Sequence, residues 1–162
     1  MFIYSPDDYD INLALKPPFL LIVIMVYCVL PLVFILIAYN PSPKFQASFG
    51  YLQHYAGPIS FLGCLPAALV LFAWTKRSPH AGKQWRHIWR WGKWLLSLSL
   101  LAHIFLLVSQ RGLAIWNSFS MLDSDRLVIV NIGIDMLSLY YLWRIPRVTD
   151  VFADFPSAHP TN

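Results

Sequence analysis

The sequence predicts an all-α polytopic membrane protein with four transmembrane helices. Of its 162 residues, 57% are hydrophobic and only 12% are charged, about half the charged fraction of a typical soluble domain. Four long apolar runs account for this composition, and a segment rich in cations and indoles, Lys83 to Trp94, separates the second run from the third. We therefore expect one four-helix transmembrane domain over residues 1–150 and a short cytoplasmic tail over residues 151–162.

The first predicted span is Phe19 to Tyr39, which contains no charged residue and is long enough to cross a bilayer as a helix. It is too long for a signal peptide and no small-residue cleavage site follows it. Pro31 inside the run predicts a kink. The other predicted spans are about Tyr55 to Trp74, Trp94 to Val108 and Leu127 to Trp143.

An apolar patch follows the third predicted span. It begins at Leu113, includes Trp116 and ends at Met121, which makes it too short to cross a bilayer. We expect this patch to lie along the far membrane surface.

The segment between the second and third spans predicts an interfacial helix. Its cations are spaced three, four and three residues apart, which places them in one stripe on a helix that runs straight into the third span. Cations interleaved with indoles are typical of the lipid headgroup region, so we expect a site for anionic lipid there. A plain topology signal, anchored by long cationic side chains, is a compatible interpretation. The residues of the predicted lipid site are Lys83, Arg86, Arg90, Lys93, Trp85 and Trp89.

The distribution of Lys and Arg predicts the orientation. Lys16, the six cations from Lys76 to Lys93, Arg144 and Arg147 fall on one side, which makes nine, and the other three of the 12 cations fall on the opposite side. Cytoplasmic loops carry the excess of Lys and Arg in membrane proteins. We therefore expect both termini and the basic segment in the cytoplasm.

Two ionisable side chains, His103 and Asp135, lie well inside predicted spans. They stand at similar distances from the loop that joins spans three and four, so an antiparallel hairpin would bring them level. An ionised Asp in mid-membrane costs at least ~2.5–3.5 kcal/mol, so it should face the bundle, a cavity or a partner. The pair could serve as a proton or ion relay, fix the helix register, or contact another subunit. The polar residues at helical spacing beside them are Ser99, Gln110, Asn131 and Ser138.

The remaining sequence offers little for other chemistry. We expect no catalytic residues, since the common nucleophile, phosphate-loop and metalloprotease motifs do not occur. We expect no cofactor and no metal, because His103 has no histidine at matched depth for a heme, and Cys28 and Cys64 suit apolar packing. Nucleic acid is not expected either, since the net charge of +4 comes from one loop between apolar runs.

A short pattern near the N-terminus, Asp7-Asp-Tyr-Asp10 followed by Leu15-Lys-Pro-Pro18, resembles a known family. It is similar to that of the YfeZ-like proteins, small bacterial inner-membrane proteins without an assigned function, although Leu13 stands where the family has glycine. The resemblance implies a bacterial inner-membrane location and the four-span layout. It implies no activity.

For function we expect a non-catalytic role as an accessory or scaffolding subunit of a larger membrane assembly. The partners would then be membrane lipids and other membrane subunits. The alternative is a small transporter, or a proton- or ion-conducting oligomer, built around His103 and Asp135. A water-accessible path through the bundle would favour this alternative, and a sealed contact would favour the accessory subunit.

Overall fold

The computed structural model describes residues 4–10, 14–38, 58–117 and 123–156, and their regular secondary structure is helical. A short 3₁₀ turn, Pro6–Asp8, comes first. The α-helices are α1 (Phe19–Ala38), α3 (Pro58–Thr75), α4 (Lys83–Arg90), α5 (Gly92–Asn117), α6 (Asp123–Arg144) and α7 (Pro146–Ala153). Within these ranges the only β pairing is an isolated bridge between Tyr9 and Leu15. The predicted all-α class is confirmed.

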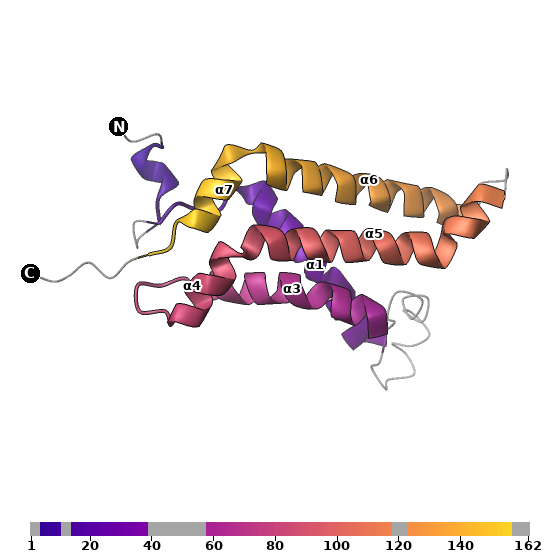
Figure 1. Ribbon diagram of the computed structural model, residues 1–162, viewed down its shortest axis with the longest axis horizontal. Helices are drawn as coiled ribbons and strands as arrows, with labels where there is room; N and C mark the ends of the chain where they lie inside the picture. The colour runs from indigo at the N-terminus through magenta and orange to yellow at the C-terminus, as the bar shows by residue number, and fades with distance from the viewer. Residues whose placement is uncertain (1–3, 11–13, 39–57, 118–122, 157–162) are drawn as a thin grey trace, which may run out of the picture.

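The four longer helices lie alongside one another, and the short helices α4 and α7 sit together with the N-terminal segment at one end (Figure 1). α3 packs against both α1 and α5, while α6 packs mainly against α5. Fully buried side chains where α1, α3 and α5 meet include Leu21, Met25, Val70, Leu96 and Leu100. Gly63 of α3 allows close packing there, since a Cβ on it would lie 3.3 Å from the Ala102 Cβ of α5.

By length and composition, one described helix can cross a membrane by itself. It is the part of α5 from Gly92 to Ser109. A second candidate is α6 with α7, which together pass the same test but meet at a 69° bend. The described apolar parts of α1 and α3, Phe19–Val33 and Phe61–Thr75, are shorter. Four spans therefore stay a prediction, and the start of the second span, Tyr55 to Gly57, lies outside the described residues.

α5 differs from the prediction at both of its ends. We expected the third span to stop at Val108, with a separate surface patch from Leu113, but α5 continues without a break to Asn117. The last part of that patch, residues 118–121, lies outside the described residues. We also expected the basic stripe to run into α5, but α4 ends at Arg90 and a turn at Trp91 separates the two helices. The reason is the packing of α7. It contacts the indole of Trp89 before this turn and the backbone of Gly92 after it.

Residues 151–156 belong to the folded part. α7 crosses the boundary that we placed at residue 150, and Val151 and Phe152 are buried. The Phe152 ring packs at a tilt against the Trp89 ring, with ring centroids 5.0 Å apart. The packed structure therefore extends at least to Pro156, which is also buried.

Candidate functional site

His103 and Asp135 meet between α5 and α6. The His103 Nδ1 lies 2.9 Å from Asp135 Oδ2, and the Asp135 side chain is completely buried whereas that of His103 is 29% exposed. An ionised carboxylate can only accept, so in that state Nδ1 carries the hydrogen. The other carboxylate oxygen, Oδ1, is buried and has no hydrogen bond of ordinary geometry in the described part of the chain. The structure thus places one hydrogen-bonded His–Asp pair inside the bundle.

Tyr27 of α1 is the third member of this site. Its ring meets the His103 ring edge-on, with centroids 5.9 Å apart, and its hydroxyl donates to Asn131 Oδ1 at 3.4 Å. The same hydroxyl also interacts with the Asp135 carboxylate. Tyr27 therefore links α1 to α6 across the His103–Asp135 pair. Sequence reasoning missed Tyr27, although a phenol in an uncharged apolar run was the available signal.

Of the polar residues predicted beside the pair, Ser99 lies apart from it. Ser99 faces α3 instead, where its Oγ accepts a 3.0 Å hydrogen bond from the Ala67 backbone N–H. Ala67 follows Pro66, whose ring disturbs the regular backbone hydrogen bonding of α3. Ser99 thus supplies a hydrogen-bond acceptor for the Ala67 N–H at this point of the helix. Ser138 is buried one helical turn after Asp135. The side chain of Gln110 lies outside the described residues.

The predicted lipid site is divided between two helices. Lys83, Arg86 and Arg90 are exposed on α4, but Lys93 lies on α5, where its Nζ donates to Thr149 Oγ1 at 3.1 Å. Arg86 also donates to the Pro79 carbonyl oxygen at 2.9 Å. These cations share one end of the molecule without forming the single continuous stripe that we expected.

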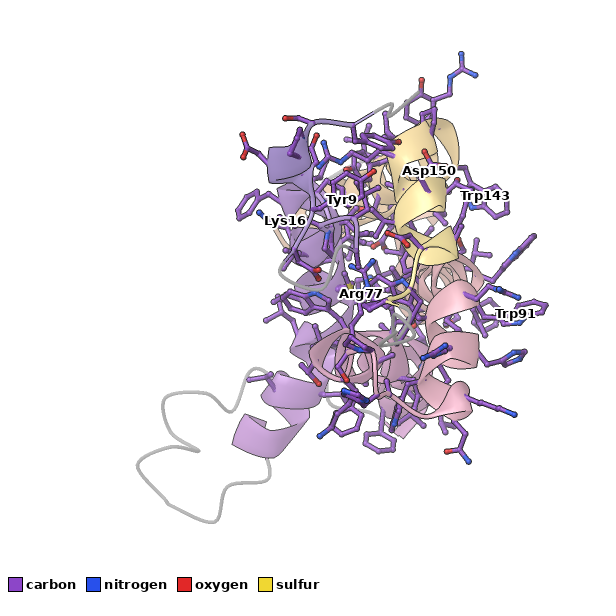
Figure 2. All side chains as sticks on the ribbon, turned by 90° about the vertical axis from the view of Figure 1, so that its left-hand side faces the viewer. Tyr9, Lys16, Arg77, Trp91, Trp143 and Asp150 are labelled. Carbon is purple, nitrogen blue, oxygen red and sulfur yellow. The ribbon has the colours of Figure 1, made fainter. Side chains whose placement is uncertain are left out.

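The indoles of the same segment separate into buried and exposed groups. Trp85 packs edge-on against Phe72 of α3 at 5.1 Å, and Trp89 is completely buried, with its Nε1 donating to the Val151 carbonyl oxygen at 2.8 Å. The structure thus places Trp89 in the core. The exposed indoles at this end are those of Trp91, Trp94 and Trp143, and Figure 2 shows Trp91 and Trp143 projecting on the same side.

Arg77, just after α3, is a buried anchor. Its side chain is 3% exposed, its Nη1 donates to the Leu15 carbonyl oxygen at 2.8 Å, and its Nη2 donates to that of Asp154 at 2.9 Å. The guanidinium also stacks over Trp89, 5.0 Å from the ring centroid. Burial lowers the pKa of Arg77, while the negative charges of Asp10 and Asp154 act in the opposite direction. From the sequence, Arg77 was counted only as a topology signal.

Further contacts join the two ends of the chain, and we call residues 4–10, 14–18 and 146–156 the terminal cap. Arg147 Nη2 donates to Asp8 Oδ1 at 2.7 Å, and the Leu15 backbone N–H donates to Asp154 Oδ2 at 2.6 Å. The Tyr4 hydroxyl donates to the Asp150 carboxylate, and this hydrogen bond raises the pKa of Tyr4. Figure 2 looks onto this end and shows Arg77 between the two segments. The cap is therefore one folded unit held on α3 and α4.

The described residues contain no group of three or more His, Cys, Asp or Glu side chains that could hold a metal ion. Cys28 and Cys64 are buried free thiols on α1 and α3.

These observations define an all-helical protein with a buried His–Asp pair and a terminal cap. Residues 4–154 match the model of a family described as "Protein of unknown function (DUF2919)", and the chain belongs to that family. No curated protein and no solved structure matches the chain. Membership of an uncharacterised family is thus confirmed, while the YfeZ-like resemblance stays a prediction.

Proposed function

We propose that this chain is a non-catalytic integral membrane protein with four transmembrane helices, which serves as an accessory or scaffolding subunit in the bacterial inner membrane. The observation that carries the proposal is the outward surface of the helices, which is apolar along α1, α3, α5 and α6. In water such contiguous apolar stripes would be unfavourable, whereas lipid or a partner helix would cover them. Large exposed side chains in these stripes include Val23, Val26, Leu30, Leu62, Leu65, Leu69, Leu98, Leu101, Phe105, Val130, Ile134 and Leu137.

The lengths of α1 and α3 support their assignment as spans. α1 contains 20 residues and α3 contains 18, which corresponds to about 30 and 27 Å of helix. The hydrocarbon layer is about 30 Å thick, and a slightly short helix is tolerated by local thinning. With α5 and α6 these helices make the four proposed spans.

The end that contains α4 is proposed to face the cytoplasm. It combines the exposed cations Lys83, Arg86 and Arg90 with the exposed indoles Trp91 and Trp94. Cations on the cytoplasmic side and Trp at the interface are both typical of membrane proteins. The same cations would attract anionic headgroups, each contributing about 1 kcal/mol near the surface.

A structural role is supported by how few ionisable groups the proposed spans contain. Among Asp, Glu, His, Lys and Arg, the sequence places only His103 and Asp135 in the ranges Phe19–Tyr39, Tyr55–Trp74, Trp94–Val108 and Leu127–Trp143, and these two contact each other. A proton path across a bilayer needs a longer series of exchanging groups. The pair instead suits a polar contact that sets helix register and leaves one ring nitrogen for a partner.

The second candidate is a proton- or ion-conducting oligomer, favoured by the fully buried side chain of Asp135 inside a proposed span. It predicts pH-driven proton flux in proteoliposomes that Asp135→Asn abolishes. Flux equal to that of empty liposomes would exclude this candidate.

Reporter fusions test the membrane arrangement. With a cytoplasm-only and an exported-only reporter fused after Pro43, Pro79 and Trp116, we expect the Pro79 fusion to be active only with the cytoplasmic reporter. The other two fusions should show the opposite behaviour. A Pro79 fusion active only on the exported side would overturn the arrangement.

Native mass measurement after gentle detergent extraction tests the accessory role. At native expression we expect the chain to co-purify with at least one other membrane protein. A clean monomer without a co-purifying protein would contradict this part of the proposal.

A further inference from the structure

One ring nitrogen of His103 is available to a molecule outside the chain. Nδ1 is engaged by Asp135, but Nε2 has no hydrogen-bond partner in the described residues and is not among their buried atoms. The side chain is 29% exposed although its carboxylate partner is fully enclosed. The outer edge of the imidazole is therefore a small polar spot on the surface of the bundle.

This spot lies near the middle of α5. His103 stands eleven residues after Gly92 and fourteen before Asn117, which corresponds to about 16 and 21 Å along the helix axis. In the proposed bilayer arrangement Nε2 would thus face hydrocarbon, where an unpaired polar atom is unfavourable. The partner has to be lipid-soluble and able to form a hydrogen bond.

The Asp135 carboxylate determines what kind of partner Nε2 can take. With Nδ1–H held by the carboxylate, Nε2 of the neutral imidazole accepts a hydrogen bond. With the ring hydrogen on Nε2 instead, that nitrogen is a donor, since the roles of the two ring nitrogens depend on the tautomer. One atom can therefore pair with a hydroxyl in one state and with a carbonyl in the other.

We propose that His103, held by Asp135, binds a ring oxygen of a lipid-soluble quinone or quinol. These molecules present the carbonyl or the hydroxyl that the two states of Nε2 require, and they dissolve in the hydrocarbon layer. The rings of Tyr27 and His103 meet edge-on with their centroids 5.9 Å apart, and the hydrogen bond from Tyr27 to Asn131 ties α1 to α6 beside them. The exposed part of His103 is less than a third of its side chain, which suits one ring oxygen better than the broad face of a helix. The inference concerns binding alone and rests on the proposed membrane arrangement.

The experiment uses the full chain in lipid nanodiscs with a photoreactive azido derivative of a short-chain ubiquinone. Labelled peptides are mapped by mass spectrometry, and decylubiquinone serves as the competitor. We expect labelling near Tyr27, His103 and Asn131 that the competitor suppresses. Labelling confined to other parts of the chain would overturn the inference.

The decisive variant is His103→Asn. The Asn amide nitrogen can take the place of Nδ1 opposite Asp135, but nothing replaces Nε2, so the bundle should keep its melting temperature. Loss of one hydrogen bond should weaken competitor binding about 3- to 10-fold. His87→Asn on the exposed face of α4 is the matched control and should leave binding unchanged.

Two results would separate the possible failures. Equal quinone affinity in the wild type and His103→Asn would overturn the inference, and a change in oligomeric mass in that variant would assign Nε2 to a partner helix instead. If the Pro79 reporter fusion fails, the proposed membrane arrangement itself is wrong. If that fusion behaves as expected and quinone does not bind, only the quinone inference fails.

Discussion

Gly92 and Phe152 occupy adjoining space at the start of α5. A Cβ built on Gly92 would lie 2.3 Å from Cε1 of the Phe152 ring, so the ring packs directly on the glycine backbone. The Phe152 ring also packs against Trp89, with the two ring centroids 5.0 Å apart. The absence of a side chain at one position is therefore what lets α7 dock on α4 and α5.

Gly92→Ala should undock α7. The ring cannot move toward Trp89, so we expect a loss of about 1–3 kcal/mol in the free energy of unfolding, as for other overpacked cores. Thermal melts in one detergent measure this loss. In the double variant Gly92→Ala with Phe152→Leu, the smaller leucine side chain leaves room for the added methyl group, so the two losses should be less than additive. Gly133→Ala is the control, since nothing lies within 4 Å of the added Cβ. Equal effects of Gly92→Ala and Gly133→Ala would contradict this account.

Asp135 and His103 should show coupled effects on stability. Asp135→Asn should be mild because Asn keeps an acceptor, whereas Asp135→Leu should cost more because it leaves the Nδ1 of His103 without a partner. Changing both residues to Leu should recover part of that loss, with a coupling of about 0.5–2 kcal/mol. Thermal melts of the wild type, His103→Leu, Asp135→Leu and the double variant complete the cycle. Strictly additive losses would mean that the two side chains do not interact in the membrane.

Arg77→Met should release both segments of the terminal cap together. The guanidinium donates to the carbonyl oxygens of Leu15 and Asp154, one on each segment, so its removal breaks both attachments. Limited proteolysis with mass mapping should show faster cleavage within residues 4–18 and within residues 146–156. Arg90→Met, which removes an exposed cation on α4, is the control and should leave both cleavage rates unchanged. Release of only one segment would argue against Arg77 as the common anchor.

The attachment of the N-terminal segment should weaken in acid. The hydrogen bond from Arg147 holds the pKa of Asp8 below its ordinary value of 3.8, so the folded state favours the ionised carboxylate. The stabilisation is therefore present at pH values above that ordinary value and is lost as the pH falls through the lowered pKa. Hydrogen exchange of the amides of residues 4–10, followed from pH 7 downward, measures this loss.

Arg147→Gln should flatten this acid dependence, because Asp8 then loses its charged partner. Asp7→Asn is the matched control, since the Asp7 backbone carbonyl, not its carboxylate, accepts the hydrogen bond from Lys16. An unchanged profile in Arg147→Gln would show that another group governs the acid response.

The sequence identified His103 and Asp135 as neighbours, because this prediction depends only on the number of residues between each of them and the loop. The positions of His103 and Asp135 relative to the loop between their helices were enough to predict that they lie level, because an α-helix rises by a constant amount per residue. Tyr27 could not be assigned in the same way. Its place beside the pair depends on how α1 rotates and packs on α5, which no local pattern in α1 specifies.

The basic segment shows that composition alone does not predict which indoles are buried. Trp85, Trp89, Trp91 and Trp94 look alike in the sequence, where indoles among cations predict an interface. The structure buries Trp89 beneath α7 and leaves Trp91 and Trp94 exposed. Spacing alone cannot contain that information, because α7 lies more than fifty residues further along the chain.

By itself the sequence determined the all-helical class, the approximate positions of the helices and the concentration of cations at one end. These properties follow from local apolar length and helical periodicity, which act within a segment. Only the tertiary structure decided that Arg77 and Trp89 are buried, that α4 and α5 are separate helices, and that the two chain ends form one cap. Those outcomes depend on contacts between distant segments, where a buried guanidinium or indole is stable only if backbone carbonyls from elsewhere in the chain reach it.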